Sequence, residues 1–395
     1  MVAKKGVQMV LEISNEEREE RIKKIQIEMA NRDLDAYIVH STQSEFASVF
    51  YLSNHTSVWE SCGVLIPKEG EPILLIGPEA EPYAQSRSTI KKIVKMIEYR
   101  ESAEPEYPDI PVGNFKELFR GLNSGKGVKR IGLGDYAITP LPVYNAINEA
   151  LPVDGQIIKA DDIISNLRII KSETEILLLK KAHEITEKVL DEILGKIKPG
   201  LTEKEVVGMV LESIYRNGAE CEAFPQYIFS GINTRNAISK TTYKKLEKNE
   251  MIQINIGAQY SGYTSAIGRP IVIGKMSSDM KKNVKFGLEA HLKTYEWIKE
   301  GVVSGDVAKK YKDFFVENGF EKNYLYGPCH GTGIFEVEKP WMETNSDYLL
   351  KENMTFMADT FFTAFDYGFR WEDGFRVTKT GVEVFSSKWQ QIIEL

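Results

Sequence analysis

Residues 329–340 read CHGTGIFEVEKP, in which a histidine enters a glycine-rich turn. Three other stretches also place polar residues in strand-forming sequence beside glycine turns. They are FPQYIFSGINT at 224–234, INIGAQYSGYTSA at 254–266, and FMADT with GFRWED at 356–360 and 368–373. Polar groups that a strand buries need a partner or a function. These four stretches are therefore the candidates for the chemistry of the chain.

The segments around them predict an α+β domain. Ser172 and Glu175 form a capping box for a helix that runs to about residue 195, and Thr202 caps a second helix over about 203–217. The other expected elements are strands at 225–230, 251–258 and 269–274, helices at 278–299 and 305–318, and β-forming runs at 353–366 and 374–385. This order is typical of a mostly antiparallel sheet with helices.

The first 160 residues predict a separate, smaller α/β domain. Ser14 caps a helix over 15–33, which a buried strand at 34–39 follows. The other expected elements are a strand pair at 63–66 and 72–76 across the turn 68–71, a strand at 131–134 and a helix at 141–150. We therefore expect two domains, residues 1–162 and 163–395.

The composition excludes several classes of function. The 395 residues carry 50 basic and 57 acidic side chains, a net charge of −7, which does not suit a nucleic-acid binder. No apolar run reaches the length of a membrane span, and the N-terminus becomes charged too early for a signal peptide. Cys62, Cys221 and Cys329 form no CxxC pair. We expect a reduced, cytoplasmic protein with a small-molecule substrate and no membrane or nucleic-acid partner.

Five motifs come in an order that resembles a known family. They are LRIIKSETEI at 167–176, SGINT at 230–234, GY at 262–263, HGTG at 330–333 and GFRWED at 368–373. Together they resemble the pita-bread superfamily (peptidase M24) of methionine aminopeptidase, aminopeptidase P, prolidase and creatinase. The resemblance implies a creatinase-type α/β N-terminal domain, an α+β pita-bread C-terminal domain, and a homodimer with shared active sites.

The metallopeptidases of this family hold two metal ions with two Asp, one His and two Glu. Those positions fall here on Asn255, Ala266, His330, Asp359 and Glu372. Asparagine is a weak neutral ligand and alanine is none, so the resemblance implies that a two-metal site is lost. A single Mn, Zn or Fe ion on His330, Asp359 and Glu372 is the alternative. The prediction is that the protein has no cofactor.

Two further histidines of the prolidase-type enzymes are replaced, at or near Ile238 and at Val337. The metal-free creatinase branch resembles this chain at SGINT, Asn255 and Ala266. Three positions differ from creatinase. The base histidine of creatinase falls on or near Ile238 of this chain, and its guanidinium-binding carboxylate falls on Gly268. Its N-domain arginine falls near Glu60. Creatine itself is therefore not expected, and Glu60 favours a cationic or neutral substrate end.

The predicted site residues follow from these positions. The catalytic candidates are His330, Glu372, Asp359 and Glu338, the last at the family's proton-shuttle position. The substrate-binding candidates are Asn255, Phe224, Tyr227, Tyr263, Trp59, Glu60 and Arg370. The simpler interpretation of Arg370 is an ion pair on the strand surface. The simpler interpretation of Cys329 is a small buried thiol.

These residues predict a metal-independent hydrolase that cleaves a C–N bond in a small non-peptide substrate, such as an amidine or cyclic amide. His330 would activate water or carry its proton. Two alternatives stay open. One is an Xaa-Pro dipeptidase or aminopeptidase P-type metallopeptidase with an altered ligand set, and the other is a non-catalytic binding protein on the same fold.

Overall fold

A computed structural model describes residues 11–395. The chain forms two compact units, Ile13–Arg168 and Ile169–Leu395, and the described residues before Ile13 group with the second unit. The expected boundary at residue 162 lies inside helix α6 (Asp161–Ile169). Among the described residues, no helix is both long and apolar enough to cross a membrane.

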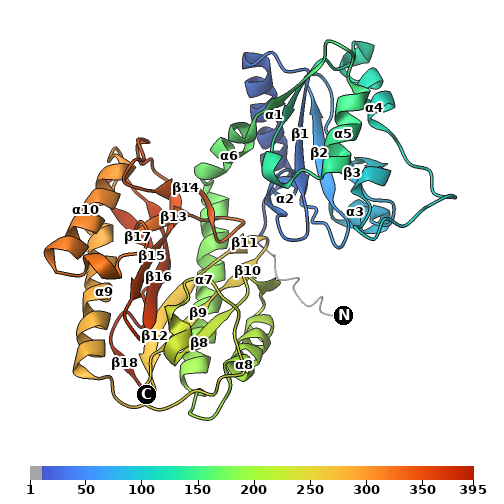
Figure 1. Ribbon diagram of the computed structural model, residues 1–395. Helices are drawn as coiled ribbons and strands as arrows, with labels where there is room; N and C mark the ends of the chain where they lie inside the picture. Colours follow the sequence, from blue (N-terminus) through green and yellow to red (C-terminus); the bar gives the residue numbers. More distant parts are fainter. Residues whose placement is uncertain (1–10) are drawn as a thin grey trace, which may run out of the picture. The chain divides into compact units, whose positions relative to one another are not determined.

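The N-terminal unit is a six-stranded mixed sheet between helices (Figure 1). The strand order is β4-β3-β2-β1-β5-β6, with β1 antiparallel to β2 and parallel to β5. The strands are β1 (Ala36–Ser41), β2 (Cys62–Pro67), β3 (Ile73–Ile76), β4 (Lys92–Lys95), β5 (Arg130–Leu133) and β6 (Gln156–Lys159). The other helices are α1 (Asn15–Asn31), α2 (Ala47–Ser53), α3 (Glu81–Arg87), α4 (Phe115–Gly121) and α5 (Leu141–Ala150).

The C-terminal unit is built on a large sheet of order β14-β13-β15-β16-β12-β9-β8, antiparallel along this path. Its strands are β8 (Tyr227–Ser230), β9 (Ile252–Ile256), β12 (Ile267–Val272), β13 (Cys329–Gly331), β14 (Glu338–Met342), β15 (Thr355–Thr363) and β16 (Gly368–Val377), with β17 (Val382–Val384) and β18 (Ile393–Glu394) attached. A small second sheet joins β7 (Cys221–Glu222), β10 (Ala258–Tyr260) and β11 (Tyr263–Thr264).

Four helices pack on one face of the large sheet (Figure 1). They are α7 (Glu173–Leu194), α8 (Glu203–Arg216), α9 (Ser278–Glu296) and α10 (Ser304–Glu317). Ile254 of β9 packs with apolar side chains of α7 and α8, and Trp371 of β16 packs with those of α9 and α10. Because side chains alternate along a strand, the residues next to Ile254 and Trp371 point to the opposite face.

The helix starts agree with the sequence. Ser172 and Glu175 make the reciprocal hydrogen bonds of a capping box at α7, and Thr202 with Glu205 does the same at α8. Ser14 caps α1. The α/β plus α+β fold class predicted from the sequence is confirmed, because caps and strand alternation are local signals that survive folding.

Candidate active site

A row of five residues crosses the sheet face that lies opposite the four helices. Residues directly paired in neighbouring strands share a face. The row, called here the polar row, consists of Tyr227 in β8, Asn255 in β9, Gly268 in β12, Glu372 in β16 and Asp359 in β15. The register thus brings four sequence-predicted site residues together from four strands.

Gly268 sits at the centre of the polar row and keeps it open. A Cβ at this position would lie 2.9 Å from Glu372 Cβ and 3.2 Å from Arg370 Cγ. Any larger residue would push Glu372 and Arg370 out of place. Gly268, which stands where creatinase has a guanidinium-binding carboxylate, is therefore required here by packing.

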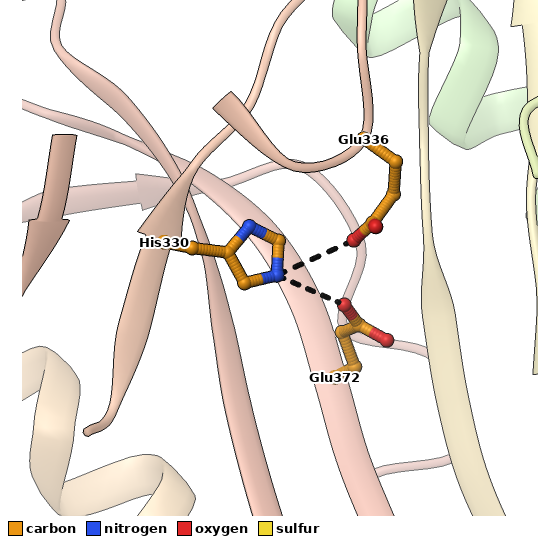
Figure 2. Close-up of side chains that lie close together, drawn as sticks. All are labelled: His330, Glu336 and Glu372. Atoms are coloured by element: carbon orange, nitrogen blue, oxygen red, sulfur yellow. Dashed lines mark ion pairs between the residues drawn. The ribbon is translucent and has the colours of Figure 1, made fainter. Parts of the chain in front are cut away.

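His330 lies beside Glu372 on the same face (Figure 2). Its Nε2 lies 3.4 Å from Glu336 Oε1 and 3.7 Å from Glu372 Oε1. Its Nδ1 lies 3.1 Å from the carbonyl oxygen of Gly331. A carbonyl can only accept, so Nδ1 carries the hydrogen and Nε2 faces the two carboxylates.

Burial and charge set the protonation of this trio. Burial lowers the pKa of His330, but Glu336 and Glu372 outweigh it and raise that pKa to about 9. Burial raises the pKa of Glu336 to about 8. Burial also acts to raise the pKa of Glu372, but the interactions with His330 and Arg370 outweigh it and lower that pKa to about 2. At neutral pH the arrangement favours a protonated His330 beside an ionised Glu372. Glu336 is then the carboxyl group that can gain or lose a proton near neutral pH.

Asp359, at the far end of the polar row, is held by two neighbours. Arg370 Nε lies 2.9 Å from Asp359 Oδ1, an ion pair without the alignment of a hydrogen bond. Tyr326 donates its hydroxyl hydrogen to Asp359 Oδ2 at 2.8 Å and accepts from Arg370 Nη2 at 2.8 Å. Burial raises the pKa of Asp359 and Arg370 opposes this. Arg370 is thus anchored to a carboxylate, but the pair is buried and does not lie on the strand surface as the simpler interpretation of the sequence expected.

Aromatic rings form the other end of the polar row. Tyr227 lies 5.6 Å from Phe224 and 5.2 Å from Phe229, measured between ring centroids. Burial raises the pKa of Tyr227, and Arg370 and Glu336 act on it electrostatically. Tyr227 therefore lies near the charged groups with Phe224 packed against it, and their role in substrate binding stays a prediction.

Tyr263 and Glu338, two other predicted residues, have structural partners instead. Tyr263 is fully buried and donates its hydroxyl hydrogen to Glu175 at 2.7 Å. Glu338 accepts from the backbone N–H of Phe335 at 2.9 Å and lies 3.8 Å from Lys171. The acid of this loop that reaches His330 is Glu336. The predicted roles of Glu338 in catalysis and of Tyr263 in substrate binding stay predictions.

Sequence reasoning missed Glu336 as a site residue. It lies in the turn between β13 and β14, where the register shifts after His330. Its spacing from His330 carries no signal, because the shape of the turn decides which of its side chains points inward. Cys329, which neighbours His330, belongs to a core cluster on the helix side, so the two do not form a dyad.

Trp59 and Glu60 lie in the N-terminal unit. Trp59 is 78% exposed and Glu60 is buried. Their predicted role in a substrate site stays a prediction.

Comparison with known families identifies the chain. Residues 178–379 match metallopeptidase family M24, and residues 21–170 match the creatinase/prolidase N-terminal domain. This chain belongs to metallopeptidase family M24. Similar M24 proteins include the Xaa-Pro dipeptidase of Pyrococcus horikoshii, 28% identical over 95% of this chain and 99% of that one. The Xaa-Pro dipeptidase of Pyrococcus furiosus is 26% identical over 83% and 90%.

Solved structures of similar proteins share the fold. The prolidase from Pyrococcus horikoshii OT3 has a TM-score of 0.82 and 25% identity, over 95% of this chain and 100% of that one. The X-Pro aminopeptidase from Thermotoga maritima MSB8 has a TM-score of 0.82 and 24% identity, over 95% and 99%. The family expected from the motifs is confirmed, and the relatives are Xaa-Pro enzymes rather than creatinases, which corrects the expected kinship.

The two-metal centre of M24 metallopeptidases does not fit these residues. Asn255 replaces one carboxylate, and its buried Oδ1 accepts no hydrogen bond. Ala266 replaces another and is fully buried. Two divalent ions would keep too few carboxylates to balance their charge in a buried site. The residues that could hold one ion are His330, Glu336 and Glu372, whose ligand atoms lie within 4.8 Å of one another. The ligand set expected from the sequence had Asp359 where this set has Glu336.

Proposed function

We propose that this M24 protein hydrolyses a C–N bond of a small substrate by acid–base catalysis at His330, Glu336 and Glu372. The observation that carries the proposal is the buried imidazole between two carboxylates whose pKa values are driven apart. Two neighbouring acids of unlike pKa can divide the roles of proton carrier and fixed charge. The two missing carboxylates count against the rival two-metal mechanism.

Each member of the trio has a part in this mechanism. In the fraction of molecules with Glu336 ionised, which grows as the pH approaches its pKa of about 8, Glu336 takes a proton from water as the water oxygen bonds to the substrate carbon. The His330 imidazolium stabilises the oxyanion, since its Nε2 is 3.4 Å or more from either carboxylate and so is free to donate. Glu336 then returns the proton to the leaving nitrogen as the C–N bond breaks. Glu372 keeps His330 charged throughout.

Asn255 supports substrate binding in this proposal. Its Oδ1 is buried, belongs to a residue of the polar row and has no hydrogen-bond partner among residues 11–395. An unmet acceptor in a buried site costs free energy until a donor arrives. A substrate N–H is the complementary group. Tyr227 and Phe224 would cover the apolar part of the substrate.

A second candidate is an Xaa-Pro dipeptidase that uses one metal ion. The similarity to Xaa-Pro dipeptidases over nearly the whole chain favours it, and His330, Glu336 and Glu372 form a donor set that one divalent ion accepts. For this candidate, Xaa-Pro dipeptides are the first substrates to test. A homodimer with shared active sites stays a prediction for both candidates.

Metal content and turnover together separate the candidates. Protein purified without chelator is analysed by mass spectrometry and assayed on Xaa-Pro dipeptides, cyclic amides and amidines, before and after EDTA dialysis. We expect turnover that survives EDTA, that Glu336→Gln and His330→Ala abolish, and that Glu338→Gln retains. Turnover that disappears with EDTA and returns with Mn²⁺ or Zn²⁺ would establish the second candidate. No turnover in the whole panel would leave the binding-protein alternative.

A further inference from the structure

A buried glutamine in β9, Gln253, binds the backbone of Arg370 in β16. Gln253 Oε1 accepts from the backbone N–H of Arg370 at 2.6 Å, and Gln253 Nε2 donates to the backbone carbonyl of Arg370 at 3.2 Å. Strand β12 lies between β9 and β16 in the order of the sheet. The side chain of Gln253, which is 3% exposed, therefore spans a whole strand to reach its partner.

Pro270 in β12 explains why a side chain is needed at this place. The antiparallel ladder between β12 and β16 pairs Gly268 with Glu372, and its continuation along both strands would set Pro270 opposite Arg370. An antiparallel pair is joined by N–H groups that donate to the carbonyls across the ladder. Proline has no N–H, so Pro270 cannot donate to the carbonyl of Arg370. On its other side Pro270 is paired with Gln253, whose side chain can reach across it.

The side-chain amide of Gln253 supplies the acceptor and the donor that a peptide unit of β12 would otherwise supply. Its orientation is fixed by its partners, because a backbone N–H only donates and a carbonyl only accepts. Nε2 also donates to the carbonyl of Ile254 at 3.1 Å, so both of its hydrogens are used. A glutamate at residue 253 would turn a carboxylate oxygen toward two carbonyls, and a methionine would leave buried backbone groups unpaired. The position therefore requires an amide of this length.

The backbone that Gln253 holds carries the guanidinium at the end of the polar row. Arg370 Nη2 donates to the hydroxyl oxygen of Tyr326 at 2.8 Å and to the carbonyl of Ala237 at 3.1 Å. Arg370 Nε lies 2.9 Å from Asp359 Oδ1. These partners come from the segment between β8 and β9, the segment before β13, and β15. One side chain meets all of them only from a narrow range of backbone positions, so its contacts depend on where β16 is held.

We infer that Gln253 is a positioning residue of the candidate site, which fixes the backbone of Arg370 across the gap in the ladder at Pro270. The guanidinium is thereby held against Asp359 and Tyr326. Within residues 11–395, the hydrogen bonds of the Gln253 side chain all go to backbone groups, so it acts through Arg370 and is not a catalytic residue. Such positioning matters because a displacement of about 1 Å in a site can lower turnover on the order of 100-fold.

Hydrogen exchange of the full chain, followed by mass spectrometry, tests the hold on the backbone. Gln253→Met keeps the length of the side chain and removes both hydrogen bonds to Arg370. We expect the Arg370 amide to exchange about tenfold or more faster in this variant. Gln226→Met is the matched control, because Gln226 bonds the N–H and the carbonyl of Gly257 in the same way, at 3.0 and 3.2 Å. It should leave the exchange of the Arg370 amide unchanged.

A double-mutant cycle in urea denaturation tests the hold on the guanidinium. Tyr326→Phe removes one of its hydrogen-bond partners, and no hydrogen bond within residues 11–395 joins Tyr326 to Gln253. If Gln253 positions Arg370, Gln253→Met and Tyr326→Phe share part of their loss. The unfolding constant of the double variant should then lie about fivefold or more below the value that the two single variants give when multiplied. With Gln226→Met in place of Gln253→Met, the two effects should simply multiply.

An unchanged exchange rate of the Arg370 amide, multiplying effects in the cycle with Gln253, or equal coupling in the cycle with Gln226 would each overturn the inference. If Gln253→Met does not fold, Gln253→Asn takes its place, because it keeps the amide but is one methylene shorter. Neither measurement uses turnover, so a failure of the proposed function leaves their result intact. For any substrate that is turned over, kcat/KM should fall about tenfold or more in Gln253→Met, and an unchanged kcat/KM would also overturn the inference.

Discussion

Arg370 Nε lies 2.9 Å from Asp359 Oδ1, in a pair buried at the edge of the polar row. The two residues come from neighbouring strands, where Asp359 is opposite Glu372 and Arg370 precedes Glu372 by two positions on the same face. The guanidinium compensates Asp359, whereas Glu336 and Glu372 are the acids nearest to His330. Glu372 is left to compensate the histidine.

Loss of Arg370 should destabilise the fold strongly. Arg370→Met leaves Asp359 buried without its cation, and breaking a buried pair costs about 3–5 kcal/mol. Urea denaturation measures this. Arg376→Met, which removes a more exposed arginine paired with Glu173 and Glu383 on the same strand, should cost about 1 kcal/mol or less. Equal losses would mean that the Asp359 pair carries no special weight.

Gly268→Ala should disturb both stability and activity. The new methyl group would meet Glu372 Cβ at 2.9 Å, and overpacking of this kind costs about 1–3 kcal/mol. The displaced Glu372 should lower kcat as well. Gly208→Ala in helix α8, where a Cβ has open space, should instead stabilise by about 1 kcal/mol. A fully active Gly268→Ala variant would contradict the assigned role of Glu372.

Tyr263→Phe should affect stability and leave turnover unchanged. The variant removes the 2.7 Å hydrogen bond to Glu175, a loss of about 1–3 kcal/mol when the acceptor is charged. Tyr227→Phe, the matched change in the polar row, should alter KM or kcat with a smaller effect on unfolding. If Tyr263→Phe changes the substrate kinetics more than Tyr227→Phe does, Tyr263 belongs to the substrate site after all.

Stability should fall at alkaline pH through His330. Burial lowers the pKa of His330, but Glu336 and Glu372 raise it to about 9, above the value of about 6.5 in an unfolded chain. The protonated ring therefore contributes stability that is fully present below about pH 6.5 and is lost as the pH rises through about 9, on the order of 3 kcal/mol. Urea unfolding between pH 6 and about 10 should show this decline in wild type and a weaker one in His330→Gln. Parallel curves would refute it.

The sequence by itself determined the fold and half of the site. The serine and threonine caps and the order of the motifs are local features, and they identified the helices, the strands and the family. The resemblance to the family singled out Asn255, Asp359 and Glu372, and the strand register then places them on one face.

Only the tertiary structure decided which charges meet. Glu336 reaches His330 while Glu338 turns to Lys171, because the bulged turn after β13 sets the direction of each side chain. Arg370 pairs with Asp359 across the adjacent strands β15 and β16, and Tyr263 donates a hydrogen bond to Glu175, which lies 88 positions away in the sequence. Buried polar groups choose their partners by position within a few ångströms, and a linear pattern of residue types does not encode that distance.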